Sequence, residues 1–123
     1  MLNPTTKHRN RAFNNQQRRC YYCTALMWLR KPTKFAVQHC IGIGEIARFQ
    51  CTAEHLVARQ TGGTNRSQNI VAACWFCNAM RHRRPTPLDH DDYRVLVRKR
   101  VKRLKWHPTK FRHLLQDDVG VSA

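Results

Sequence analysis

The chain has 123 residues, of which 23 are lysine or arginine and 7 are aspartate or glutamate, so its formal net charge is +16. This length favours one domain with a modest core, and the longest apolar run, residues 70–76, is far shorter than the ~20 residues that span a bilayer. Because so much positive charge repels itself, we expect a polyanionic partner, with nucleic acid ahead of an anionic membrane surface.

The N-terminal residues contain no hydrophobic stretch of the kind that a secretory signal requires. We therefore expect a cytoplasmic protein that is kept in a reducing compartment. In such a compartment, cysteines indicate metal ligands before they indicate disulfides. The six cysteines are Cys20, Cys23, Cys40, Cys51, Cys74 and Cys77.

Residues 1–19 are polar and basic, and we expect a short helix there that begins near Pro4, with Thr5 or Thr6 as its N-cap. Cys20-Tyr21-Tyr22-Cys23 follows as a tight knuckle. The N-terminal segment therefore reads as a basic arm that leads into a pair of cysteines.

The pattern between this knuckle and residue 50 is weaker. Residues 27–29 and 35–37 are predicted as short strands on either side of a turn at Lys31-Pro32. Gly42 and Gly44 interrupt any regular pattern that follows.

From Arg48 onward the pattern is clearer. Apolar and polar residues alternate up to His55, which predicts a strand that ends there. Residues 60–67 are a polar loop, and residues 70–73 are a second short strand. A helix over residues 75–83 would complete a ββα unit.

The last part of the chain is predicted as a basic helical arm. Asp89 is a suitable N-cap for a helix that runs to Lys105, and the acidic residues of its first turn suit the helix dipole. Trp106-His107-Pro108 then interrupts it. One face of this helix is apolar: Tyr93, Leu96, Val97, Val101 and Leu104. We expect that face to pack on the core and the basic face to meet DNA.

Two pairs of cysteines, Cys20-x2-Cys23 and Cys74-x2-Cys77, have the spacing of zinc knuckles. Two intervening residues let both thiolates reach one ion at ~2.3 Å while N–H groups of the turn satisfy the sulfurs. The pairs lie further apart than the roughly 15–20 residues of an isolated zinc ribbon. One structural Zn²⁺ would therefore close over an intervening element and supplement a small core. The alternative is four unrelated buried thiols.

Cys40 and Cys51 remain outside these pairs. With His39 they would make a second metal site, since histidine and cysteine are both good zinc ligands. Cys51, however, falls on the inward face of the predicted strand, where a free cysteine behaves as a small hydrophobic residue. We favour buried thiols over a second site.

Several polar residues and glycines lie between and beside the knuckles in a defined order. The order is Glu54-His55, Gly62-Gly63, Asn69 and then Asn78 directly after Cys77. With the two knuckles, this order resembles the zinc-containing branch of the HNH endonucleases, a family whose core is a ββα-metal module. The resemblance covers residues 20–84.

The resemblance implies a role for each polar residue. His55 would be the general base that takes a proton from water, and Glu54 and Asn78 would hold one catalytic Mg²⁺ or Mn²⁺. Asn69 would orient the loop that carries the base. The chain departs from the family by Glu54 in place of the usual aspartate, by Asn78 in place of the last histidine, and by the lack of a proline soon after His55.

Each of these residues also has an ordinary structural interpretation when it is taken alone. His55 would be a strand-end histidine, Glu54 a solvated charge, and Asn69 and Asn78 a turn residue and a helix-surface amide. His82 lies one helical turn beyond Asn78. It is a candidate metal ligand, a candidate phosphate contact, or a plain surface histidine.

Basic side chains around this unit are predicted to hold DNA, mainly through phosphate contacts. They are Arg59, Arg66, Arg81, Arg83, Arg84, Arg98 and Lys102. We thus expect an α+β fold with a ββα-metal core at residues 20–84 and a four-cysteine zinc site. Basic N- and C-terminal helices flank this core, over residues 1–19 and 85–123.

The predicted function is a metal-dependent endonuclease that hydrolyses phosphodiester bonds of double-stranded DNA, as a monomer or a homodimer. The alternative is a non-catalytic zinc-knuckle protein that binds DNA in a regulatory role.

Overall fold

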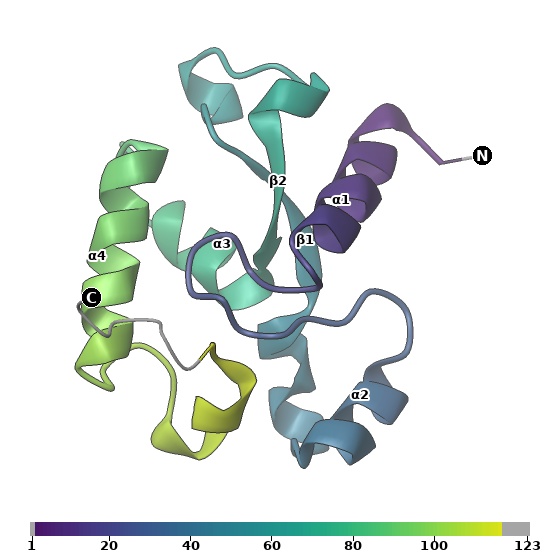
Figure 1. Ribbon diagram of the computed structural model, residues 1–123. Helices are drawn as coiled ribbons and strands as arrows, with labels where there is room; N and C mark the ends of the chain where they lie inside the picture. Colours follow the sequence, from purple (N-terminus) through teal and green to yellow (C-terminus); the bar gives the residue numbers. More distant parts are fainter. Residues whose placement is uncertain (1, 117–123) are drawn as a thin grey trace.

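A two-stranded antiparallel hairpin lies at the centre of the molecule, in a computed structural model that describes residues 2–116 (Figure 1). Strand β1 (Cys51–His55) pairs with β2 (Ile70–Cys74), with Cys51 opposite Cys74 and His55 opposite Ile70. Strand β1 falls where the alternation of apolar and polar residues predicts it, and β2 covers the second short strand predicted at residues 70–73.

Two helices cover the two faces of this hairpin. Helix α1 (Pro4–Asn15) packs along both strands on one face, and α3 (Trp75–Arg81) follows β2 directly and returns along the other face (Figure 1). Successive side chains of a strand point to opposite faces. Thr52 points to the face that α3 covers, where its hydroxyl accepts a hydrogen bond from Asn78. The predicted ββα unit is therefore present, and the α+β fold class is confirmed.

Helix α1 begins at Pro4, as expected, but its N-cap is Asn3, two residues before Thr5, the nearer of the two predicted caps. The side chain of Asn3 accepts a hydrogen bond from the backbone N–H of Thr6 at 2.8 Å. Proline at the first helical position needs no N–H partner, so the cap moves to Asn3, and the two threonines lie inside the first turn.

The segment before β1 differs from the prediction. Residues 35–37 lie in helix α2 (Pro32–His39), and a 3₁₀ helix, η1 (Ile43–Phe49), leads into β1. Phe35 and Ala36 are buried, and a helix that starts at Pro32 places both on one face. The strand predicted at residues 27–29 is reduced to a single isolated bridge between Trp28 and Gln50.

The loop between the two strands contains two short 3₁₀ helices, η2 (Arg59–Thr61) and η3 (Ser67–Asn69). Gly62, between them, has a φ of 96°, which favours glycine. Gly63 is required for another reason: a Cβ atom there would collide with the backbone carbonyl of Val57. The Gly62-Gly63 pair therefore lets the loop fold back on itself.

Helix α4 (His90–Lys102) and a last 3₁₀ helix, η4 (Thr109–Leu114), complete the described chain. The side chain of Asp89 caps α4 as predicted, by accepting from the N–H of Asp91. Three residues of the predicted apolar face, Tyr93, Val97 and Val101, are buried, whereas Leu104 follows the end of the helix and is exposed. Residues 117–123 of the predicted arm lie outside the described residues.

One core joins all of these elements. Phe13 of α1, Phe49 of η1, Val97 of α4 and Leu114 of η4 belong to the same buried cluster, together with Tyr22 of the first knuckle. Within residues 2–116, each helix is too short or too polar to cross a membrane.

Candidate metal centre and active site

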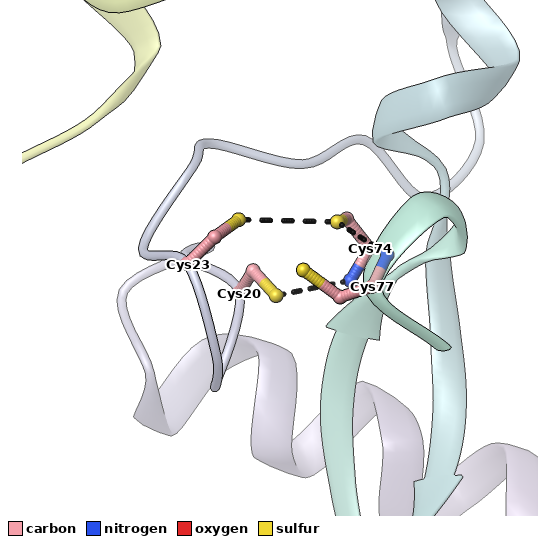
Figure 2. A group of neighbouring side chains, drawn as sticks. All are labelled: Cys20, Cys23, Cys74 and Cys77. Carbon is pink, nitrogen blue, oxygen red and sulfur yellow. Dashed lines mark hydrogen bonds between the residues drawn. The ribbon is translucent and has the colours of Figure 1, made fainter. Parts of the chain in front are cut away.

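The two knuckles meet in a single buried cluster (Figure 2). The first pair follows α1, and the second pair spans the junction of β2 and α3. All four sulfurs lie within 4.8 Å of one another, and the cysteines are at most 2% exposed. With Zn–S bonds of about 2.3 Å, a tetrahedral site separates its sulfurs by about 3.8 Å. The 3.9 Å between the sulfurs of Cys23 and Cys74 fits that geometry.

Burial makes the cluster a poor place for thiolates without a cation. Burial, together with hydrogen bonds that the Cys23 thiol donates to Cys20 and Cys74, raises the pKa of Cys23 well above its usual value. The pKa of Cys77 is raised in the same direction, again chiefly by burial. For Cys20 burial acts in the same sense, but hydrogen bonds from the other three thiols outweigh it and lower its pKa. A divalent ion at the centre would offset the charge of the thiolates.

Backbone N–H groups surround the sulfurs, as the knuckle spacing leads one to expect. The donor–sulfur distances are 3.4 Å from Tyr22 and 3.3 Å from Cys74 to Cys20, 3.5 Å from Ala25 to Cys23, and 3.4 Å from Cys77 to Cys74. The four cysteines are therefore an assembled ligand set consistent with a structural zinc site. Four unrelated thiols would not converge in this way.

Glu54, the carboxylate of the predicted active site, is almost completely buried, with 1% of its surface exposed. Its Oε2 atom accepts hydrogen bonds from the hydroxyl of Tyr22 at 2.9 Å and from Nη1 of Arg81 at 3.1 Å. Its Oε1 atom lies 2.9 Å from Nε2 of His82. The carboxylate is thus fixed on one side by buried groups and faces a half-exposed histidine on the other.

Arg81 was predicted to contact DNA, and its position does not fit that role. The side chain is 3% exposed, and besides Glu54 it donates to the backbone carbonyls of His55, Leu56 and Leu88. A buried carboxylate requires a nearby cation, and Arg81 supplies it. Arg81 therefore holds the end of β1 instead of a phosphate.

Tyr22 has a role that sequence reasoning missed. It lies between Cys20 and Cys23, and its ring is fully buried. Burial first, and the charge of Glu54 second, raise the pKa of Tyr22, so its hydroxyl stays protonated and donates to Glu54. The first knuckle thereby connects the cysteine cluster to the carboxylate.

Asn78 and His82 lie one turn apart on the same side of α3 and face β1. The Nδ2 group of Asn78 donates to Oγ1 of Thr52 at 3.1 Å and to the backbone carbonyl of Ala53 at 3.3 Å. This leaves the Oδ1 atom of Asn78 as its available acceptor. The structure therefore brings Glu54 and His82 into contact and places Asn78 of α3 against Thr52 and Ala53, the two residues that precede Glu54 in β1.

His55 ends β1, on the strand face opposite to Glu54. Its Nε2 atom lies 2.9 Å from Oδ1 of Asn65 in the loop, a contact that sequence reasoning also missed. Asn69 connects the two sides of this loop. Its Oδ1 atom accepts from the N–H of Val57 at 2.8 Å, and its Nδ2 group donates to the carbonyls of Val57 and Thr64 at 3.0 and 2.8 Å.

Residues 38–84 match the family described as HNH endonuclease. This part of the chain is an HNH endonuclease domain. The matched range holds β1, the glycine loop, β2, α3 and the second knuckle, whereas Cys20 and Cys23 lie before it. Comparisons with curated proteins and with solved structures gave no match.

The basic residues around the HNH domain differ in their surroundings. Five of the predicted DNA contacts are exposed: Arg59, Arg66, Arg83, Arg84 and Lys102. Arg98 is half-buried and donates to the backbone carbonyls of Tyr21 and Tyr22, so, like Arg81, it holds part of the protein. The sequence shows that both arginines are charged, but it does not show which partners they have.

The two remaining cysteines do not form a second metal site. Among residues 2–116, Cys20, Cys23, Cys74 and Cys77 are the one group of three or more His, Cys, Asp or Glu residues whose ligand atoms converge. Cys51 is a buried thiol in the HNH domain, as expected, and burial raises its pKa to about 12. Cys40 is exposed, which corrects the prediction that both thiols are buried.

Proposed function

We propose that the protein is a metal-dependent DNA endonuclease that hydrolyses phosphodiester bonds. The observation that carries this proposal is the contact of Glu54 with His82 on the β1–α3 side of the HNH domain. Asn78 lies one turn earlier in α3 and hydrogen-bonds β1, and His55 ends the same strand. An HNH nuclease acts on nucleic acid, and a net charge of +16 suits a polyanionic substrate.

Glu54 and Asn78 would hold one Mg²⁺ or Mn²⁺, because both ions prefer oxygen ligands. His82 would complete the protein ligands, since its Nε2 atom already lies beside Oε1 of Glu54. The ion would act as a Lewis acid that stabilises negative charge on the phosphate and the leaving oxygen. Tyr22 and Arg81 would keep Oε2 in place, so that Oε1 faces the site.

His55 would be the general base, and its contact with Asn65 supports one choice of the atom that would act. A carbonyl oxygen only accepts hydrogen bonds, so Oδ1 of Asn65 requires the hydrogen of His55 to be on Nε2. The Nδ1 atom then keeps its lone pair and takes the proton of the attacking water. Asn69 would support this arrangement by bracing the loop that carries Asn65.

The exposed basic residues would hold double-stranded DNA across the site through its phosphates. With about six to ten phosphate contacts, binding should weaken roughly 10³- to 10⁵-fold between about 50 and 200 mM salt.

One active site of this kind cuts one strand at a time, leaving a 5′-phosphate and a 3′-hydroxyl. A monomer would nick the duplex, and a homodimer would break both strands. The four cysteines would bind Zn²⁺ with a structural role.

A second candidate is a non-catalytic DNA-binding protein with the same fold. One observation favours it: both oxygens of Glu54 already have protein partners, as in a purely structural ion-pair network. In that case His82 would serve as a hydrogen-bond partner and not as a metal ligand.

Nicking of supercoiled plasmid in Mg²⁺, Mn²⁺ or EDTA separates the two candidates. We expect nicking with at least one of the two ions, none in EDTA, and a fall of roughly 10²- to 10⁴-fold in the His55→Ala variant. His113→Ala is the matched control, because His113 is exposed and its ring hydrogen-bonds the backbone carbonyl of His39 in α2.

Nicking that survives His55→Ala undiminished would refute the assignment of the base. A wild-type protein that binds plasmid but cuts it with neither ion would establish the non-catalytic candidate.

A further inference from the structure

Two side chains far along the chain from the cysteines reach their sulfur atoms. The indole Nε1 of Trp106 lies 3.3 Å from the sulfur of Cys77, and Nε2 of His107 lies 3.2 Å from the sulfur of Cys23. Trp106 and His107 are 8% and 7% exposed. Both residues lie beyond the range that matches the HNH family.

Arg48 determines the direction of the hydrogen bond from His107. Its Nε atom lies 2.8 Å from Nδ1 of His107, and a guanidinium group can only donate. The Nδ1 atom therefore accepts, the ring hydrogen is on Nε2, and that hydrogen points to the sulfur of Cys23. Trp106 presents no ambiguity, because an indole nitrogen is a donor only.

The same arginine also fixes the backbone of this segment. Nη2 of Arg48 donates to the carbonyl of Trp106 at 3.0 Å, and its guanidinium group lies 3.6 Å from the ring centre of Phe76. The ring of Phe76 in turn contacts both Trp106 and His107. The two donors are therefore held by packing and by a charged hydrogen bond at the same time.

These donors matter because of charge. Four thiolates around one dication carry two net negative charges, and hydrogen-bond donors are needed where water is excluded. The backbone supplies such donors to Cys20, Cys23 and Cys74. The N–H donor that reaches Cys77 comes from Trp106, and His107 adds a second donor to Cys23.

We propose that Trp106 and His107 are positioning residues of the zinc centre, which donate N–H···S hydrogen bonds to two of its ligands and slow the loss of the ion. Arg48 orients His107 for this role. It follows that zinc retention and the docking of the segment around residues 106–107 support each other. This proposal depends on the cysteine cluster and not on nuclease activity.

Zinc transfer from the full-length protein to an excess of a chelating dye tests the proposal. Trp106→Phe keeps a ring against Phe76 and removes the N–H group, so we expect release to be about 10- to 100-fold faster. His107→Phe should act in the same direction, and His107→Gln, which retains an amide N–H, should restore part of the slow release. The matched control is His113→Gln, at an exposed histidine, which should release zinc at the wild-type rate.

A second measurement separates hydrogen bonding from packing. In the Co²⁺-substituted protein, a hydrogen bond to a thiolate lowers the energy of the sulfur lone pairs. Loss of the N–H group in Trp106→Phe should therefore lower the energy of the sulfur-to-cobalt charge-transfer band and move it to longer wavelength. Faster release without this shift would overturn the hydrogen-bond assignment in favour of packing.

Wild-type release rates in both phenylalanine variants, or a purified chain that binds neither Zn²⁺ nor Co²⁺, would overturn the proposal outright. If His107→Phe fails to fold, Trp106→Phe decides the question by itself.

Discussion

The cysteine cluster and the site around Glu54 lie at opposite ends of α3, and they are built differently. At the start of the helix, four buried sulfurs face one another and are enclosed by N–H groups. At its end, Glu54 is enclosed on the side of Oε2 only, whereas Oε1 meets His82, whose side chain is 29% exposed. A closed ligand set suits a structural metal, and an open position suits chemistry.

Tyr22 connects the two regions. It belongs to the backbone of the first knuckle, and its hydroxyl holds the carboxylate of Glu54. The hydrogen bond from Tyr22 should therefore couple the cysteine cluster to the carboxylate. Variants in each region test this coupling.

The largest effect is expected from Cys77→Ser, which removes one ligand of the closed set. Structural zinc contributes folding free energy on the order of 10 kcal/mol, comparable with the whole stability of a domain, about 5–15 kcal/mol. Zinc content should fall and the protein should aggregate or lose its cooperative thermal transition. Cys40→Ser, at an exposed thiol, is the control and should keep both. Full zinc retention in Cys77→Ser would shift the site to other cysteines.

Arg81→Met should have the next largest effect, because it leaves the buried charge of Glu54 without its cation. Removing one partner of such a pair costs about 3–5 kcal/mol, measured as the free energy of unfolding in urea. Arg83→Met, at an exposed arginine, should change stability by no more than about 0.5 kcal/mol. Adding Glu54→Gln to Arg81→Met should recover part of the loss. If the single variant is as stable as the wild type, the pair is not the support that we infer.

Tyr22→Phe should have a smaller effect and should tell the two regions apart. The variant keeps the ring and removes one donor to a charged acceptor, which costs about 1.5–3 kcal/mol. We expect lower stability in urea, weaker plasmid nicking and unchanged zinc content. Tyr21→Phe, at the half-exposed neighbour, is the matched control. A loss of zinc in Tyr22→Phe would show that the Tyr22 hydroxyl also supports the cysteine cluster.

Local sequence patterns predicted the framework of the fold. Two-residue spacing between cysteines, a period of two along β1 and a short apolar run at β2 are each visible within a few residues, so both knuckles and both strands were found. The triplet at residues 35–37 was assigned wrongly because a short apolar run fits a strand or a helix equally well. Burial of Phe35 and Ala36 against distant residues decides between them.

The candidate site was predictable in its residue types but not in its contacts. Motif order brought forward Glu54 and His55, yet Arg81 is indistinguishable in sequence from the exposed Arg83 and Arg84. Its interior position depends on partners such as Tyr22, which only the folded chain brings close. In the same way, no local signal connects Trp106 with a cysteine of α3.

The smallest expected effect is a difference in alkylation between the two cysteines outside the cluster. Cys51 is buried and Cys40 is exposed, so one sample compares a closed environment with an open one. Burial raises the pKa of Cys51 to about 12, so the group is a neutral thiol below that pH, and at pH 8 only roughly one in 10⁴ is the reactive thiolate. Iodoacetamide added to the zinc-loaded protein should therefore modify Cys40 and leave Cys51 and the cluster unmodified. Mass spectrometry of peptides should find all six cysteines modified only in denaturant with a chelator. Modification of Cys51 ahead of Cys40 in the native protein would mean that the face of the hairpin under α1 is open to solvent, which contradicts the packing of α1 against both strands.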